Sequence, residues 1–187
     1  MKTIHPVNIF CIIFLSLSFC FSSALAKSEG ELSAGMVNPG YKELPDWFKV
    51  SFLDLFEDVE EAADNNKRLM VYYYQDGCPY CEKLLIDNFG QKTIVDKTRK
   101  YFDVIAINMW GDREVTDFSG NSTTEKAFAR QLKVNFTPTL LLLDESANVV
   151  TRINGYYEPH LFSAVLDYVG GHKEKETNVR DYLQAVA

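Results

Sequence analysis

The sequence has few cysteines, no surplus of basic residues and no internal repeat. Four cysteines, Cys11, Cys20, Cys78 and Cys81, are too few to hold a small fold together with disulfides, so any cysteine function must be local. Lys and Arg number 19 against 26 Asp and Glu, and the net charge of -7 does not provide the positive surface that nucleic acids require. With 187 residues, 47% of them hydrophobic, the chain can bury one core. We therefore predict a single folded domain and no nucleic acid partner.

Long apolar runs are also missing, because the longest, at residues 9–21, has 13 residues, fewer than the roughly 20 that span a bilayer. The small residues at 24–26 are of the kind that signal peptidase accepts. We predict that residues 1–26 are a cleaved export signal. An uncleaved membrane anchor is one alternative. Lipidation at Cys20 is another, although a bulky residue precedes this cysteine.

The remaining chain divides into an N-terminal arm at 27–46, a domain at 47–172 and a C-terminal helix at 173–187. The arm mixes Lys, Ser, Glu, Gly and Pro without periodicity, which is typical of an extended linker. Apolar spacing and turn residues predict the order of the elements. We expect helices at 51–66, 79–90, 94–101, after Thr123 or Thr124, at 159–169 and at 179–186, and strands at 69–74, 104–109, 139–143 and 149–153.

Two of these helices have an apolar face that we expect to be buried. In the first helix the face consists of Phe52, Leu55, Phe56, Val59, Ala62 and Ala63. In the second it consists of Leu84, Leu85, Ile86 and Phe89. The aromatic run at 72–74 suits a buried strand, so we interpret it as core and not as a stacking surface. The polar segment 110–122 is interpreted as a long loop, either a docking element or an ordinary solvated insertion.

Cys78, Pro79, Tyr80 and Cys81 stand where a predicted strand ends and a helix begins. The N-terminus of a helix offers unpaired N–H groups and the positive end of the dipole, which stabilise a thiolate over a thiol. Cys78, at the N-cap, benefits most, and Pro79 fits the first turn because its missing N–H is not needed there. The spacing brings Cys81 within bridging distance of Cys78. We predict that Cys78 attacks disulfides and that Cys81 resolves the product.

Two other interpretations of the cysteine pair remain open, a static disulfide and half of a metal site. A zinc site needs two more ligands, and the chain after residue 26 offers only His160 and His172, without metal-type spacing. Redox use is therefore favoured, and we expect neither a metal nor a bound cofactor. A non-catalytic thiol carrier of a soft metal is kept as an alternative function.

Three features together resemble the thioredoxin superfamily over roughly residues 50–170. They are the cysteine pair after an apolar strand, Thr137-Pro138-Thr139 before a second strand, and a hairpin that closes at Asn154-Gly155. The stretch 73–84 is most similar to exported SoxW-like disulfide reductases. The resemblance implies a thioredoxin-like α/β fold, with a central mixed β-sheet flanked by helices and here an extra C-terminal helix.

The resemblance also implies a cis bond between Thr137 and Pro138, packed against the cysteines. Pro138 then belongs to the catalytic site, while Thr137, Pro79 and Tyr80 contact the substrate, with Tyr80 as the aromatic group beside the sulfurs.

The sequence departs from the family pattern at three positions, one of which is Gly77, in place of the tryptophan that commonly precedes the first cysteine. The buried acid expected six residues before the first cysteine is replaced by Tyr72, and its partner lysine by Ala106. Asp76, Glu82 or a water molecule must then accept the proton of Cys81.

These observations predict an exported, monomeric thiol:disulfide oxidoreductase that reduces disulfide-containing proteins. A membrane electron-transfer protein is the expected reductant. A thiol oxidase that donates its disulfide to folding proteins is the alternative within the same chemistry. The sequon at 135–137 would place a glycan beside the substrate groove, and the C-terminus is not a retention signal, so we expect a bacterial periplasm.

Overall fold

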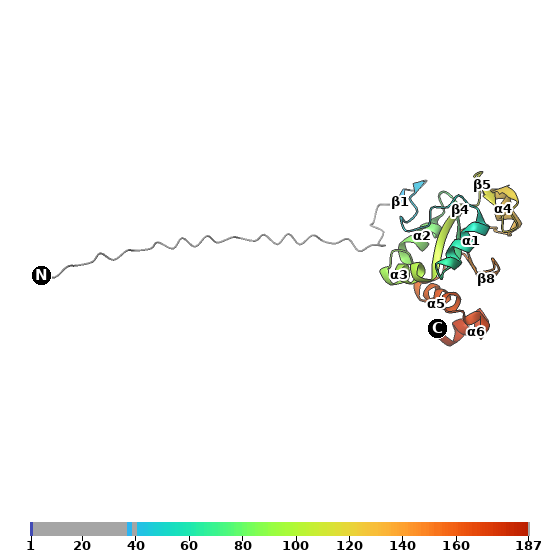
Figure 1. The fold of residues 1–187 in the computed structure, drawn as a ribbon. Helices are drawn as coiled ribbons and strands as arrows, with labels where there is room; N and C mark the ends of the chain where they lie inside the picture. The colour runs from blue at the N-terminus through green and yellow to red at the C-terminus, as the bar shows by residue number, and fades with distance from the viewer. Residues whose placement is uncertain (2–36, 39–40, 187) are drawn as a thin grey trace.

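The computed structural model describes residues 1, 37–38 and 41–186 (Figure 1). The predicted export signal at 1–26, apart from Met1, and most of the predicted arm lie outside the described residues. Two short strands, β1 (Val37–Asn38) and β2 (Tyr41–Lys42), pair antiparallel within the segment that the sequence assigned to a linker.

A four-stranded mixed sheet forms the centre of the molecule, with strand order β4-β3-β7-β8. Strands β3 and β4 are parallel, whereas β7 is antiparallel to both β3 and β8. The mixed sheet confirms the predicted fold class. The strands are β3 (Arg68–Tyr74), β4 (Phe102–Asn108), β7 (Thr139–Leu143) and β8 (Val149–Asn154).

Helices cover both faces of this sheet, so that its central strands are buried on each side (Figure 1). Successive side chains of a strand point to opposite faces. Met70 and Tyr72 accordingly enter the core shared with α2, α3 and α5, while Val71 and Tyr73 enter the core shared with α1 and α4. The helices are α1 (Leu55–Asp64), α2 (Pro79–Asp87), α3 (Lys92–Tyr101), α4 (Glu125–Gln131), α5 (Pro159–Gly170) and α6 (Val179–Val186).

Side-chain caps determine where two of the helices begin. Asp54 accepts the N–H of Glu57 at 3.1 Å at the start of α1. Thr124 accepts the N–H of Ala127 at 3.3 Å at the start of α4, which confirms the predicted cap. Each oxygen satisfies one amide that the helix leaves without an internal partner.

Three aromatic or aliphatic side chains that we expected in the core are exposed. Phe52 is 101% exposed because α1 starts only after Asp54, and Leu53 turns inward in its place with a φ of 63°. Phe56 is 52% exposed because the buried stripe of α1 is narrow. Ile86 is 47% exposed, and α2 ends at Asp87, before the predicted stop at Gly90.

The segment predicted as a polar loop contains a second small sheet. Strands β5 (Glu114–Thr116) and β6 (Ser122–Thr124) pair antiparallel. Asp117 fixes the turn between them by accepting the N–H groups of Ser119 and Asn121, and these bonds lower the pKa of its carboxyl. The insertion is therefore ordered by its own hydrogen bonds.

The C-terminal part of the chain packs on the α5 side. A Cβ added to Gly170 would lie 2.3 Å from Cγ of Tyr101, so glycine permits the close approach of α5 to α3. Beyond a 3₁₀ turn, η1 (Lys173–Lys175), helix α6 packs Val179, Tyr182 and Leu183 on the core, as its spacing predicts. In residues 37–38 and 41–186, none of the helices combines the length and the apolar composition of a membrane span.

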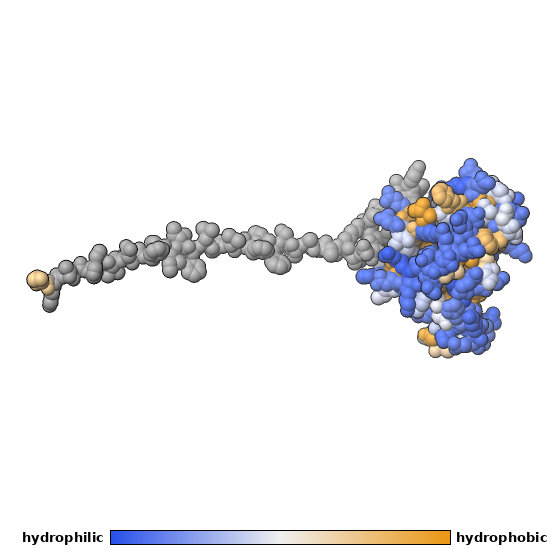
Figure 2. All heavy atoms as spheres, viewed as in Figure 1, coloured by the Kyte–Doolittle hydropathy of each residue, from blue (hydrophilic) through white to orange (hydrophobic). Residues whose placement is uncertain are grey.

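The visible face of the molecule is mostly hydrophilic, and apolar residues form small patches on it (Figure 2). The large apolar or aromatic side chains that remain at least two-fifths exposed include Val50, Phe52, Phe56, Tyr80, Ile86, Trp110, Phe136, Val149 and Val186.

Candidate active site

The cysteine pair forms a disulfide at the N-terminus of α2, with an S–S distance of 2.11 Å and a Cα–Cα distance of 5.3 Å. Cys78 is the N-cap residue, and its Sγ accepts the backbone N–H of Cys81 at 3.1 Å. Pro79 occupies the first helical position. The predicted junction of strand, cysteine pair and helix is therefore confirmed, and an amide of the first helical turn points at the sulfur of Cys78.

Burial distinguishes the two sulfur-bearing residues. Cys78 is 4% exposed, whereas Cys81 is 0% exposed. Both belong to the apolar cluster that contains Tyr72 and Leu84. Solvent and a partner molecule can therefore reach the disulfide only from the Cys78 side.

The loop before β7 closes over the disulfide. The peptide bond between Thr137 and Pro138 is cis, as the family resemblance implied. The hydroxyl of Thr137 donates to Cys78 Sγ at 3.2 Å. The carbonyl of Pro138, a buried residue, accepts the N–H of Gly155 at 2.8 Å, which ties the loop to the end of the β7–β8 hairpin. Residues 59 positions apart in the sequence thus meet at one sulfur.

Among the predicted substrate contacts, Pro79 and Tyr80 lie on the solvent side of the site. Tyr80 is 61% exposed and stands between the two cysteines in sequence. Asp76 is exposed and Glu82 is half-buried, and within the described residues neither makes a hydrogen bond to Cys81. The identity of the proton acceptor stays a prediction.

Tyr72 lies in the core beneath the cysteine pair, at the position where the family pattern has an acid. It is fully buried and pairs in register with Ala106 of β4. Its ring stacks on Tyr74, with centroids 5.8 Å apart. Burial raises the pKa of the Tyr72 hydroxyl, so it remains protonated at neutral pH and cannot take a proton from a thiol. The interpretation of this aromatic run as core is confirmed for Tyr72 and for Tyr73, which is also fully buried.

Trp110, the first residue of the segment predicted as a polar loop, is bonded to the segment that leads to the cysteine pair, a contact that the sequence did not predict. The indole Nε1 donates to the side chain of Gln75 at 2.9 Å, three residues before Cys78. The ring is 59% exposed. The available signal was its position, because Trp110 directly follows β4, whose carboxyl end lies beside that of its parallel neighbour β3.

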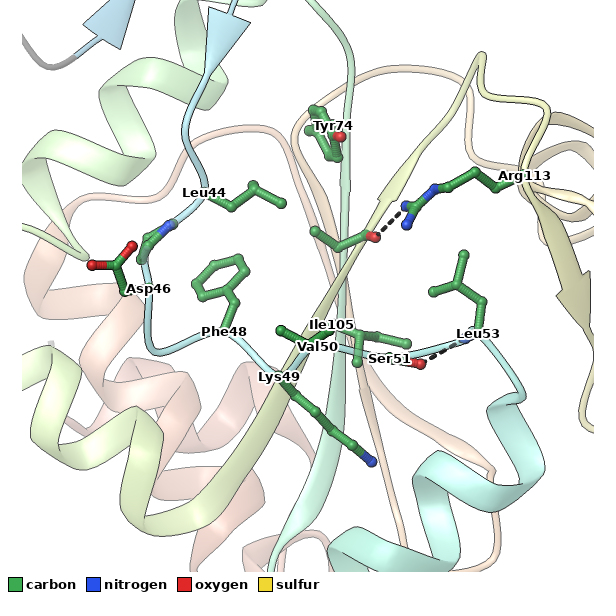
Figure 3. A pocket seen from close by; sticks show the side chains of 12 residues that line it. Leu44, Asp46, Phe48, Lys49, Val50, Ser51, Leu53, Tyr74, Ile105 and Arg113 are labelled. Carbon is green, nitrogen blue, oxygen red and sulfur yellow. Dashed lines mark hydrogen bonds between the residues drawn. The ribbon is translucent and has the colours of Figure 1, made fainter.

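A separate pocket of about 420 Å³ lies on the outer edge of β4 (Figure 3). In the close-up Leu44 and Phe48 form one wall, while Leu53 and Arg113 form the other, below Tyr74. The N-terminal segment and Arg113 also cover the backbone of this edge strand, through Lys49 N–H to Val104 O at 2.8 Å and Arg113 to Ala106 O at 3.2 Å. Covering an edge in this way prevents it from pairing with another chain.

A Cys-x-x-Cys disulfide at the start of a helix, next to a cis-proline loop and on a mixed four-stranded sheet, defines a thioredoxin-fold protein with a redox-type cysteine pair. The chain belongs to the Thioredoxin-like domain family, whose pattern matches residues 55–170.

Solved structures are similar to this chain at low sequence identity, and the two with TM-scores above 0.5 share its fold. A thioredoxin-fold protein from Helicobacter pylori is 23% identical, with a TM-score of 0.56, covering 72% of this chain and 95% of that chain. A thioredoxin from Thermus thermophilus is 21% identical, with a TM-score of 0.51 and coverage of 62% and 83%. The C-terminal domain of DsbD from Neisseria meningitidis, in the oxidised form, is 12% identical, with a TM-score of 0.46 and coverage of 62% and 92%. Comparison with curated protein sequences gives no match.

Proposed function

We propose that this protein is an exported thiol:disulfide oxidoreductase that reduces disulfides in proteins of a bacterial periplasm. One observation carries the proposal: the sulfur of Cys78 lies at the N-terminus of α2, where it accepts the N–H of Cys81 and the hydroxyl of Thr137. Two donors directed at one sulfur, together with the dipole of the helix, favour the thiolate, which is the reactive form in disulfide exchange.

The reaction begins from the dithiol form of the protein. The Cys78 thiolate attacks one sulfur of the substrate disulfide, so that a mixed disulfide forms and the other substrate sulfur leaves as a thiolate and takes up a proton. Cys81 then loses its proton and attacks Sγ of Cys78. The substrate departs with two thiols, and the protein keeps the disulfide seen in the structure. Two electrons pass from the protein to the substrate.

A second protein must restore the dithiol with two electrons and two protons. We propose a membrane electron-transfer protein for this role, because export removes the chain from cytoplasmic reductants. The sequence of residues 1–26, which is typical of an export signal, supports this assignment.

Trapping of the mixed disulfide tests the mechanism. In Cys81→Ser the attack by Cys78 can occur but the resolving step cannot, so substrate proteins should accumulate as adducts that a reducing agent releases. Cys78→Ser is the matched control and should trap almost nothing. Equal trapping by the two variants would contradict the assigned roles, and the absence of adducts from both would contradict the proposed function.

The direction of electron flow has its own test. Equilibration with glutathione buffers should give a reduction potential of about −270 mV for a reductase, whereas a value of about −120 mV is typical of an oxidase. The reductase should also reduce the disulfides of insulin. Failure to do so, together with an oxidising potential, would favour the thiol oxidase. Export is tested by fractionation and N-terminal sequencing, which should find a periplasmic protein that begins at Lys27.

A further inference from the structure

Three exposed aromatic rings stand on segments that contain the disulfide, contact it or lead to it, and each comes from a different segment of the chain. Tyr80 lies between the cysteines and is 61% exposed. Phe136, 51% exposed, precedes Thr137, whose hydroxyl contacts Cys78. Trp110, 59% exposed, is bonded to Gln75, at the end of the segment that leads from β3 to the cysteines. Three segments that adjoin the cysteine pair thus each carry exposed aromatic carbon.

The loop that carries Trp110, residues 109–113, is held in place by a buried carboxylate. Glu125 is 1% exposed and accepts the backbone N–H of Asn108 at 3.0 Å and the guanidinium of Arg113 at 2.6 Å. A Cβ added to Gly111 would lie 1.9 Å from Oε2 of Glu125, so the backbone passes directly over this carboxylate. The N–H of Lys126 also donates to the carbonyl of Gly111 at 3.0 Å.

These bonds hold the loop in one position even though the side chain at its tip faces solvent. At the start of the loop, the N–H of Met109 donates to the carbonyl of Tyr74 at 2.9 Å, which joins it to the end of β3. The N–H of Trp110 donates to the side chain of Asn108 at 3.0 Å. A ring fixed in this way loses little further conformational entropy when a partner packs on it.

The indole also presents a defined chemical surface. Its nitrogen is the side chain's single polar atom, and that atom already donates to Gln75. The amino group of Lys126 lies 5.5 Å from the ring centroid. What remains available to a partner is therefore aromatic carbon, which gains free energy when an apolar side chain covers it.

We propose that Trp110 determines which disulfides the protein exchanges, by packing against a large apolar side chain next to the substrate cysteine. This inference rests on the proposed function. The occupant is an extended polypeptide segment with an aromatic or aliphatic residue beside its cysteine, because the exposed rings stand on the segments that adjoin Cys78, where a polypeptide joined to Cys78 is held. Tyr80 and Phe136 complete the surface.

A competition experiment with two peptides tests the proposal. Each peptide carries one intramolecular disulfide, and they differ at a single position next to the first cysteine, Phe in one and Ser in the other. Fully reduced protein is mixed with both peptides, which are equimolar to each other and in excess over the protein. The early ratio of reduced peptides is measured by mass spectrometry after an acid quench. The ratio is independent of the fraction of folded protein, because both peptides meet the same molecules. We expect about a tenfold preference for the Phe peptide.

The variants separate the ring from its surroundings. Trp110→Ala should bring the ratio close to one, while Trp110→Phe, which keeps a ring but loses the bond to Gln75, should retain most of the preference. Phe56→Ala, which removes a similarly exposed aromatic ring on α1, is the matched control and should keep the wild-type ratio.

Two results would overturn the inference and leave the proposed function intact. The first is an unchanged ratio in Trp110→Ala, and the second is a loss of preference in Trp110→Phe as large as in Trp110→Ala. If the wild-type protein reduced neither peptide, the proposed function would fail together with the inference.

Discussion

Strand β3 begins in a buried ion cluster and leads at its other end to the cysteine pair, and these two regions use their side chains differently. At the first residue, Arg68 is 3% exposed. Its guanidinium donates to Glu145 at 2.8 Å, to Glu174 at 2.7 Å and to the carbonyl of Val169 at 2.6 Å, and it lies 2.7 Å from Nδ1 of His172. These contacts join the β7–β8 turn, the end of α5 and η1 to the sheet.

Beyond the opposite end of β3, the segments that adjoin the cysteine pair leave aromatic side chains exposed. Beyond Tyr74 the chain reaches the disulfide, and the aromatic rings of Tyr80, Trp110 and Phe136 remain more than half exposed there. The Arg68 end therefore binds other parts of the same chain, whereas the cysteine end leaves aromatic rings uncovered, as the proposed exchange with another molecule requires. Changes at the first should alter the free energy of unfolding, and changes at the second should alter exchange.

Replacement of the attacking sulfur gives the sharpest separation of the two regions. Cys78→Ser should lower the rate of disulfide exchange by at least about 10³-fold, because the hydroxyl cannot form the mixed disulfide. The rate is measured by insulin reduction. Residual activity near the wild-type rate would place the reaction elsewhere in the molecule.

Removal of the buried guanidinium should lower the stability of the fold and leave disulfide exchange unchanged. Arg68→Met should lower the free energy of unfolding by about 3 kcal/mol, because Glu145 and Glu174 lose their common partner. Urea denaturation measures this change. The rate of disulfide exchange per folded molecule should stay at the wild-type value. Lys92→Met is the control, since its ion pair with Asp96 is more than half exposed and contributes only about 0.3–0.5 kcal/mol. A large loss of exchange in the folded Arg68→Met variant would contradict the separation of the two regions.

The hydroxyl that contacts Cys78 should have a smaller effect, confined to exchange. Thr137→Val removes the donor at 3.2 Å from the sulfur and should slow exchange by about threefold to tenfold. Thr151→Val is the matched control, because the Thr151 hydroxyl is buried without a hydrogen-bond partner in the described part of the chain. We expect this control to exchange at the wild-type rate and to be at least as stable as wild type. If the two variants exchanged disulfides at the same rate, Thr137 would have no role in the site.

The smallest effect concerns acid stability at the Arg68 end. Hydrogen bonding from Arg68 lowers the pKa of Glu145 to about 2, from 4.5 for the free side chain. A carboxyl with a lowered pKa in the folded state stabilises the fold above the unfolded value and loses this contribution as pH falls. In Glu145→Gln the free energy of unfolding should therefore fall less steeply between pH 4.5 and about 2. Urea midpoints across this range measure it, with Glu60→Gln on the exposed face of α1 as control. Identical slopes in the two variants would contradict the shift.

The predictable parts of the fold are those whose signal is local in sequence. The apolar runs of β3 and β7 are buried on both faces, so their composition alone identifies them as central strands. The cysteine pair depends on a cap, a proline and a helix start within four residues, all visible in the sequence. The cis bond at Pro138 required the family resemblance, because spacing alone does not distinguish cis from trans.

The missed features depend on contacts between distant segments. Arg68 meets Glu145, Val169, His172 and Glu174 across 77 to 106 positions, and neither composition nor periodicity reveals such pairs. The exposure of Phe52 follows from where α1 starts, a boundary that apolar spacing locates only within a few residues. The ordered β5–β6 insertion was hidden for a similar reason, since three-residue strands carry little periodic signal.

The complete burial of Cys81 has a kinetic consequence. In the proposed exchange, Cys81 opens an adduct on Cys78 from within the same molecule, so this resolving step is first order and its rate is set by the protein. Because Cys81 is fully buried, external thiols do not compete for the Cys81 sulfur itself. Where no other thiol reaches the adduct, the geometry of the protein determines how long each partner is held.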